Sequence, residues 1–94
     1  MEKELADKKF KEMFEAIASI ESPQECKAFM RDLCTLSELE AMAERWQVVK
    51  KIDGKMSYQK IRELTGASTT TVTRVAHWLH HGMGGYRQML EKQK

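Results

Sequence analysis

The sequence predicts an all-α protein in which six helices form a single domain over residues 1–94. Apolar side chains recur every three or four residues, and no stretch alternates apolar and polar residues for long enough to form a strand. Helix-capping patterns open several of these amphipathic segments. With 94 residues, the chain is long enough for one domain, whose own hydrophobic core is small.

The composition is that of a globular protein, with 41% hydrophobic and 32% charged residues. No apolar run approaches the roughly 20 residues that a membrane-spanning helix needs. The charged N-terminal segment is typical of a helix and not of a signal peptide. We therefore expect a cytoplasmic protein that does not enter a membrane.

The two cysteines agree with a reducing compartment. Cys26 and Cys34 lie eight residues apart on one predicted helix, so their Cα atoms should be about 12 Å apart. A disulfide requires a separation below about 7 Å. We expect two reduced, mostly buried thiols, which is a simpler interpretation than a redox or metal-binding pair.

Each of the first two predicted helices has one apolar face. The helix over residues 5–18 places four apolar side chains on one side: Phe10, Met13, Phe14 and Ile17. The second helix opens with Ser22 as N-cap, Pro23 at the first helical position and Glu25 three residues after the cap. Its apolar face is formed by Cys26, Phe29, Met30 and Leu33.

The third predicted helix opens with Ser37 and Glu40 as a capping box, runs to about Ile52 and ends at Gly54. Its apolar face contains Leu39, Met42, Ala43, Trp46 and Val49. Short helices bury such faces only against partners. We expect residues 1–53, approximately, to form a dimer interface as well as part of the core. The alternative is a monomeric bundle.

A helix-turn-helix is predicted over residues 57–79. Ser57 caps a short helix on which Tyr58, Ile61 and Leu64 are expected to share one direction, and Gly66 provides a left-handed residue for a sharp turn. Ser68 or Thr69 caps the second helix. The apolar side of that helix consists of Val72, Val75, Ala76 and Leu79.

The outward side of the second helix is typical of a DNA-reading surface. In such motifs the second helix enters the major groove with its N-terminal residues first. Threonine hydroxyls and methyls can contact base edges, and arginine can bind guanine or phosphate. Threonines are poor helix formers, so several of them on an exposed face indicate a function. The outward residues here are Ser68, Thr69, Thr70, Thr73, Arg74 and His77.

The charge distribution supports the same interpretation. Residues 1–54 carry nine basic and twelve acidic residues, a net charge of −3, whereas residues 55–94 carry seven basic and two acidic residues, a net charge of +5. A basic half on a nearly neutral protein is typical of a local nucleic-acid footprint.

For residues 57–79, the alternative to a DNA-binding helix-turn-helix is a helical hairpin inside an all-helical core. Arg62 also departs from the small residue that is usual at the fifth position of the first helix.

The segment from Thr35 to Leu90, above all residues 55–57 and 71–74, resembles Trp-repressor-like proteins and most closely their YerC/YecD branch. The resemblance implies a six-helix fold with a helix-turn-helix in an intertwined homodimer. It also implies that the paired motifs read major grooves about 34 Å apart, one turn of DNA. By matching position, the resemblance places these residues at DNA: Gln59, Arg62, Thr69, Thr70, Thr71 and Thr73.

The resemblance also bears on a ligand. Two arginines clamp the amino acid in tryptophan repressors, and Arg45 and Arg74 occupy the matching positions. The glycine and serine expected nearby are Val75 and Trp78 here. Both replacements occupy space that the ligand's ring needs, so we expect no tryptophan binding and an indole of Trp78 that fills the pocket. A small-molecule corepressor of another chemistry remains an alternative. Arg45 could also be a solvated arginine with no ligand. No cofactor is expected.

The remaining constellations predict little chemistry. His77 and His81 could share a metal, but no carboxylate or cysteine lies within a turn to complete a site, so we expect none. Residues 82–85 are a glycine-rich hinge into a last helix within residues 84–92, with Tyr86 near its start. No spacing selects a catalytic set and the chain lacks depth for a shielded pocket, so we expect no enzyme.

The sequence therefore predicts a sequence-specific regulator of transcription that binds double-stranded DNA, acts as a dimer on a palindromic operator, and represses by occlusion. The alternative is a protein-interaction module that uses the same fold without DNA. The residues predicted at the DNA are Gln59, Lys60, Arg62, Ser68, Thr69, Thr70, Thr71, Thr73, Arg74 and His77.

Overall fold

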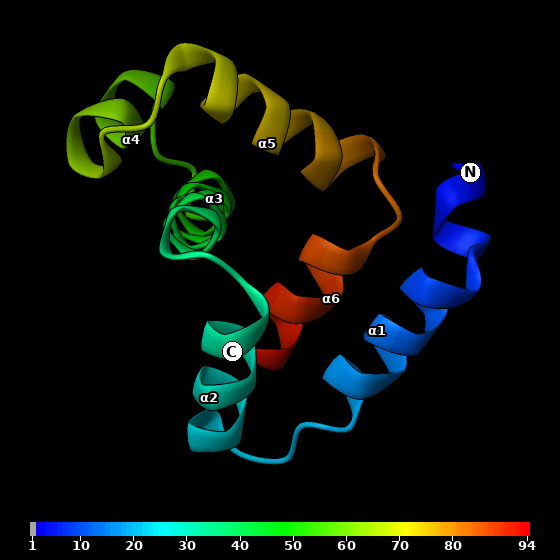
Figure 1. Ribbon diagram of the computed structural model, residues 1–94. Helices are drawn as coiled ribbons and strands as arrows, with labels where there is room; N and C mark the ends of the chain where they lie inside the picture. The colour runs from blue at the N-terminus through cyan, green and yellow to red at the C-terminus, as the bar shows by residue number, and fades with distance from the viewer. Residues whose placement is uncertain (1) are drawn as a thin grey trace. The chain divides into compact units, whose positions relative to one another are not determined.

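The computed structural model describes residues 2–94, and over these residues the chain is helical without a strand (Figure 1). This confirms the predicted all-α class. None of the described helices is long and apolar enough to cross a membrane. A short 3-10 helix, η1, precedes six α-helices: η1 Lys3–Ala6, α1 Lys8–Ala18, α2 Pro23–Leu33, α3 Leu36–Asp53, α4 Tyr58–Thr65, α5 Thr69–His81 and α6 Gly85–Lys92.

The chain divides into two compact units, one that ends at Leu36 and one from Ser37 to Lys94. The first unit contains η1, α1 and α2, and the second contains α4, α5, α6 and all but the first residue of α3. The functional segments predicted from the sequence, residues 1–53, 57–79 and 84–92, stay a prediction.

The first unit buries none of its described helical residues. The predicted helix over residues 5–18 is interrupted, because Asp7 has an extended backbone and caps α1 by accepting the N–H of Lys9 at 3.2 Å. The predicted start of α2 is confirmed: Ser22 Oγ accepts the N–H of Glu25 at 3.1 Å, with proline at the first position. Half-exposed Phe14 and Leu33 show how little of the apolar surface is covered.

Cys26 and Cys34 are not paired in a disulfide, and their reduced state stays a prediction. Cys34 lies just beyond the last residue of α2, where its backbone is extended, so the two cysteines do not share one helix. Each is partly buried, which is less than predicted.

The start of α3 differs from the prediction by two residues. The helix begins at Leu36, so Ser37 lies in its first turn and cannot be the N-cap. Thr35 and Glu38 repeat the capping-box spacing two residues earlier. The two patterns overlap in the sequence, and the one that begins at Ser37 was the wrong prediction.

The end of α3 is closed by Lys55 and not by Gly54. Lys55 has φ +65°, which is the left-handed conformation, whereas Gly54 has no positive φ. The N–H of Met56 donates to the carbonyl of Lys51 at 3.1 Å, and the N–H of Lys55 donates to that of Ile52 at 2.9 Å. This pair of bonds is a Schellman motif, in which the left-handed residue follows the C-cap. The glycine predicted to end the helix is therefore the C-cap itself.

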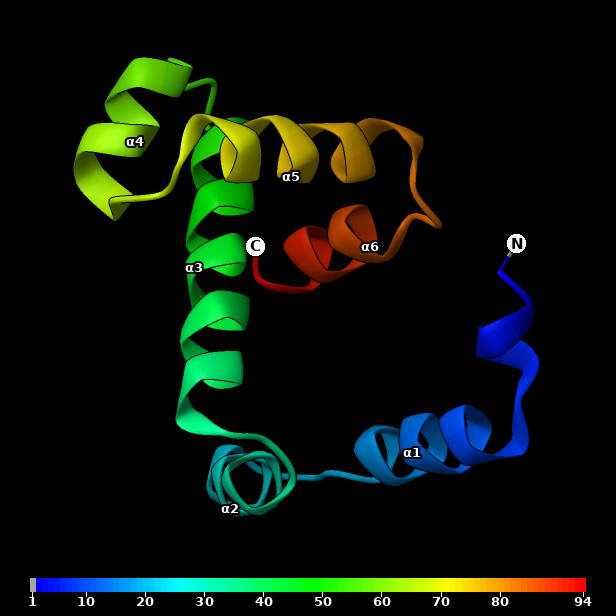
Figure 2. The same cartoon turned by 45° about the horizontal axis from the view of Figure 1, so that its top comes forward.

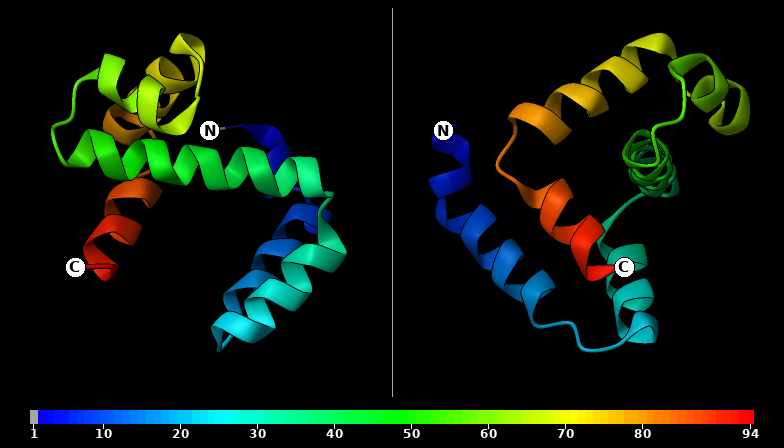
Figure 3. Two further views of the ribbon diagram at one scale, coloured as in Figure 1. Left: turned by 90° about the vertical axis from the view of Figure 1, so that its left-hand side faces the viewer. Right: turned by 180° about the vertical axis from the view of Figure 1, so that it is seen from behind.

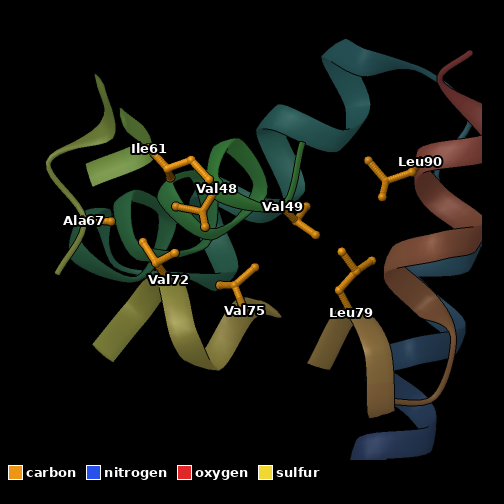
Figure 4. Packing of buried hydrophobic residues seen from close by; sticks show 8 residues of the cluster. All are labelled: Val48, Val49, Ile61, Ala67, Val72, Val75, Leu79 and Leu90. Atoms are coloured by element: carbon orange, nitrogen blue, oxygen red, sulfur yellow. The ribbon is translucent and has the colours of Figure 1, made fainter. Parts of the chain in front are cut away.

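The core of the second unit lies where α4 and α5 pack at the C-terminal end of α3 (Figures 2 and 3). Figure 4 shows its buried side chains, contributed by all four helices and the turn: Val48, Val49, Ile61, Ala67, Val72, Val75, Leu79 and Leu90. The predicted apolar side of α5 is confirmed, since Ala76 is buried as well.

Two predictions about apolar faces are correct only in part. On α3, Val49 is buried and Trp46 packs against the core as predicted, but Val48 is buried although the predicted face omitted it, and Met42 of that face is 39% exposed. On α4, only Ile61 is buried, while Tyr58 and Leu64 are 47% and 55% exposed. A residue three positions along a helix lies about 60° away from the first, and α4 is packed along too narrow a strip to cover both sides.

Candidate nucleic-acid interface

The first helix of the motif, α4, begins and ends as predicted. Ser57 Oγ accepts the N–H of Lys60 at 3.2 Å, which satisfies a donor that the helix leaves unpaired. Gly66 follows the helix with φ +75°, and its N–H donates to the carbonyl of Arg62 at 2.9 Å. These two local signals fix the bounds of α4.

The turn between the helices is also held by the hydroxyl of Thr65, which was not predicted. Thr65 Oγ1 donates to the carbonyl of Ile61 at 2.7 Å and accepts the N–H of Ala67 at 3.1 Å. Ala67 is buried in the core. The hydroxyl therefore ties α4 to the turn, and threonine one residue before the turn glycine was the only signal for it.

The second helix, α5, is capped by Ser68, which decides between the two predicted candidates. Ser68 Oγ accepts the N–H of Thr71 at 3.1 Å and also donates to Thr71 Oγ1 at 3.1 Å. Thr71 is partly buried. Both hydroxyls therefore hold the start of α5 in place, in addition to any contact with a partner.

The other residues predicted at the DNA are exposed on α4 and α5, and we call this set the reading face. It combines the outer side of α4 with the side of α5 opposite Val72 and Val75. Its residues are all exposed: Gln59, Lys60, Arg62, Thr69, Thr70, Thr73, Arg74 and His77. The structure thus leaves hydroxyl, amide and cationic groups of both helices open to a partner, and it brings Arg62 and Thr69 into direct contact.

Arg62 links the two helices of the reading face. Its Nη1 donates to Thr69 Oγ1 at 3.0 Å, so the guanidinium extends across the surface of the motif. The side chain is exposed, which explains why α4 accepts a large residue where a small one is usual. On the same helix, Gln59 Nε2 donates to Glu63 Oε1 at 3.3 Å, so one carboxylate accompanies the cations.

Arg45 and Arg74, the two arginines of the ligand prediction, line one pocket. Its volume is about 300 Å³, and its wall also includes Glu44, Val75 and Trp78. Val75 is buried, but Trp78 is 52% exposed. The indole therefore forms part of the wall and leaves the pocket open, so the prediction that it fills the space is wrong.

The three histidines form a row at the end of α5. The rings of His77 and His81 are 5.2 Å apart between centroids, and His80 Nδ1 lies 3.0 Å from Arg87 Nη2 on α6. Among residues 2–94, no group of three histidine, cysteine or acidic side chains is placed to hold a metal ion. His77 also packs edge-on against Trp78, with ring centroids 5.4 Å apart.

Comparisons with known proteins agree with this geometry. A family model described as Trp repressor protein matches residues 8–94. YerC of Bacillus subtilis strain 168, itself uncharacterized, is 36% identical over 90 residues, which are 96% of this chain and 86% of YerC. The crystal structure of a TrpR-like protein from Eubacterium eligens matches with a TM-score of 0.92 at 33% identity and covers 98% of this chain and 95% of that one.

These likenesses extend over nearly the whole chain and confirm both the resemblance and the six-helix fold with its helix-turn-helix. DNA binding and regulation of transcription are the properties of this family, in keeping with the reading face on α4 and α5. The chain therefore belongs to the Trp repressor family, on the branch that includes YerC.

Proposed function

We propose that the protein is a sequence-specific regulator that binds double-stranded DNA as a homodimer and represses transcription from a palindromic operator. One observation carries the proposal: the exposed N-terminal part of α5 presents hydroxyls, one of which is in contact with the guanidinium of Arg62 on α4. Family membership supports a DNA-binding regulator and not an enzyme. Occlusion of a promoter requires no surface beyond the reading face.

Some residues of the reading face would contact base edges, and others would contact the sugar–phosphate backbone of the DNA. Thr70 and Thr73 project from the part of α5 that leads into the major groove in such motifs, where a hydroxyl or methyl can contact a base edge. Arg74 carries the guanidinium best suited to guanine or phosphate. Lys60, near the start of α4, is a compact charge suited to a backbone phosphate.

A homodimer is supported by the apolar surface that one chain leaves open. The described helices of the first unit bury no residue, although α1 and α2 each have an apolar face. Leu36 and Met42 on the N-terminal half of α3 are 57% and 39% exposed. Apolar surface of this extent is usually covered by a partner, and a second copy would also pair the reading faces. Sedimentation equilibrium should give twice the 10.9 kDa chain mass; a 10.9 kDa species alone would contradict the dimer.

The DNA proposal is tested by selection from a random duplex library with the purified full chain. The expected product is a palindrome whose half-sites lie about 34 Å apart, one helical turn. Arg74→Ala should then weaken binding to the selected duplex by about 1–3 kcal/mol if it reads a base, and Lys60→Ala should weaken all duplexes alike. Failure to enrich any sequence, with and without a metabolite extract, would overturn the proposal in favour of a protein-interaction module.

We further propose that tryptophan does not control DNA binding. The pocket of Arg45 and Arg74 already has an indole of the chain in its wall, and Glu44 adds a carboxylate that would repel the carboxylate of an amino acid. A small molecule of other chemistry would be compatible with the open volume of about 300 Å³. Calorimetry with L-tryptophan should give no heat of binding, and micromolar binding would contradict this proposal.

A further inference from the structure

A second pocket, distinct from that of the two arginines, lies beside the first turn of α4. Its volume is about 340 Å³, and it is bounded by the end of α3, the start of α4 and the helices α5 and α6. The polar and charged side chains in its wall are Asp53, Lys55, Tyr58, His80 and Arg87. None of these residues belongs to the reading face as defined above.

The charge in this pocket is mainly positive. Within the part of the chain that the structure describes, neither Lys55 nor Arg87 has an ion pair. The one carboxylate, Asp53, has Lys94 Nζ 3.8 Å from its Oδ2, which offsets its charge. An anion in the pocket would therefore be attracted by two cations, and its repulsion by Asp53 would be reduced by the nearby Lys94.

Arg87 is held in place by a contact between helices. Its Nη2 lies 3.0 Å from His80 Nδ1. A guanidinium has five N–H donors and no acceptor, so the histidine must accept this bond. The contact uses one donor and fixes the direction of the group, and the other donors suit the planar oxygens of a phosphate.

The pocket adjoins the reading face. Tyr58, in its wall, precedes Gln59 on α4, and His80 lies one turn beyond His77 on α5. A duplex seated on the reading face would continue past these residues with its sugar–phosphate backbone. Lys55 stands in the wall in the left-handed conformation, which is unusual for lysine and places its side chain at this position at a cost in backbone strain.

We propose that this pocket receives a phosphate of the DNA backbone, bound by Lys55 and Arg87, outside the groove that α5 reads. The inference rests on the proposed DNA-binding function and extends the footprint of each copy by one phosphate. Such a contact carries no sequence information, but it fixes the position of the motif on the duplex.

The test measures DNA affinity of the full chain against salt concentration for the parent and three variants. Arg87→Gln removes the guanidinium, and Lys55→Asn removes the ammonium while keeping a residue that tolerates the left-handed conformation. Lys92→Gln is the matched control, because it removes an exposed charge from α6 that does not line the pocket. Thermal melting of each variant shows whether the fold is retained.

Lys55 and Arg87 share one phosphate, so loss of this contact in either variant should reduce the salt slope by up to about 0.9. The ratio of parent to variant affinity should then shrink by about 3.5-fold per contact when salt rises roughly fourfold. The loss should be equal for the selected palindrome and an unrelated duplex, and Lys92→Gln should behave as the parent.

Parental salt slopes in both pocket variants, with steep DNA binding by the parent, would overturn this inference alone. No DNA binding by the parent at any salt would overturn the proposed function and the inference with it. Titration with inorganic phosphate separates the remaining case: micromolar phosphate binding lost in Arg87→Gln, with an unchanged DNA slope, would identify a site for free phosphate and contradict a backbone contact.

Discussion

The two glycines that follow α3 and α4 should respond in opposite ways to alanine. Gly54 has no positive φ, and an added Cβ would meet the carbonyl oxygens of Lys51 and Lys50 at 3.5 and 3.6 Å, which is ordinary contact. Gly54→Ala should therefore stabilise the protein by about 0.4–1 kcal/mol, because it restricts the unfolded chain. Gly66 has φ +75° and open space around it, so alanine would suffer backbone strain alone. Gly66→Ala should cost about 1–2 kcal/mol.

Urea denaturation followed by circular dichroism measures the difference between the two variants. Protein concentration must be held constant, because assembly would contribute to the free energy of unfolding. Lys55→Gly completes the set and should stabilise by about 1 kcal/mol, since glycine adopts the left-handed conformation without strain. The reasoning would be refuted if Gly54→Ala destabilised the protein as much as Gly66→Ala does.

Two further substitutions test the packing and capping of the motif. Ile61→Ala should lower the free energy of unfolding by about 2–5 kcal/mol, because Ile61 is fully buried between α4 and its neighbours; a loss below 1 kcal/mol in urea denaturation would contradict its central place in the core. Ser57→Ala should cost about 1 kcal/mol by leaving the N–H of Lys60 unpaired, whereas Ser57→Asp should retain the cap, and equal melting temperatures for the two variants would argue against this role.

The sequence predicted best those elements whose ends are set by local chemistry. Ser22 and Ser57 cap their helices, and Gly66 makes the turn, because each needs only a neighbouring backbone group. The prediction from local chemistry failed where two nearby residues could each act as the N-cap. Thr35 and Ser37 offer the same capping pattern at the start of α3, and the local sequence does not decide between them.

Packing was less predictable than capping. The burial of Val48 and the exposure of Leu64 follow from how α4 and α5 cross the end of α3, which helical periodicity within one segment does not determine. The exposure of the outer side of α5 was nevertheless predicted, because the buried side was a clear apolar stripe and its complement followed; contact of these residues with DNA stays a prediction. The half-exposed position of Trp78 depended instead on a pocket formed by several helices.

The most direct test of DNA reading by α5 is the substitution Thr70→Glu. Thr70 is exposed in the first turn of α5, a turn that contains no acidic residue. A glutamate there should stabilise the helix by about 0.3–1 kcal/mol through its dipole, yet it would place a negative charge against DNA, at a cost of several kcal/mol. The account predicts an equal or higher melting temperature together with loss of binding to the selected duplex; parental DNA affinity in a folded Thr70→Glu protein would contradict it.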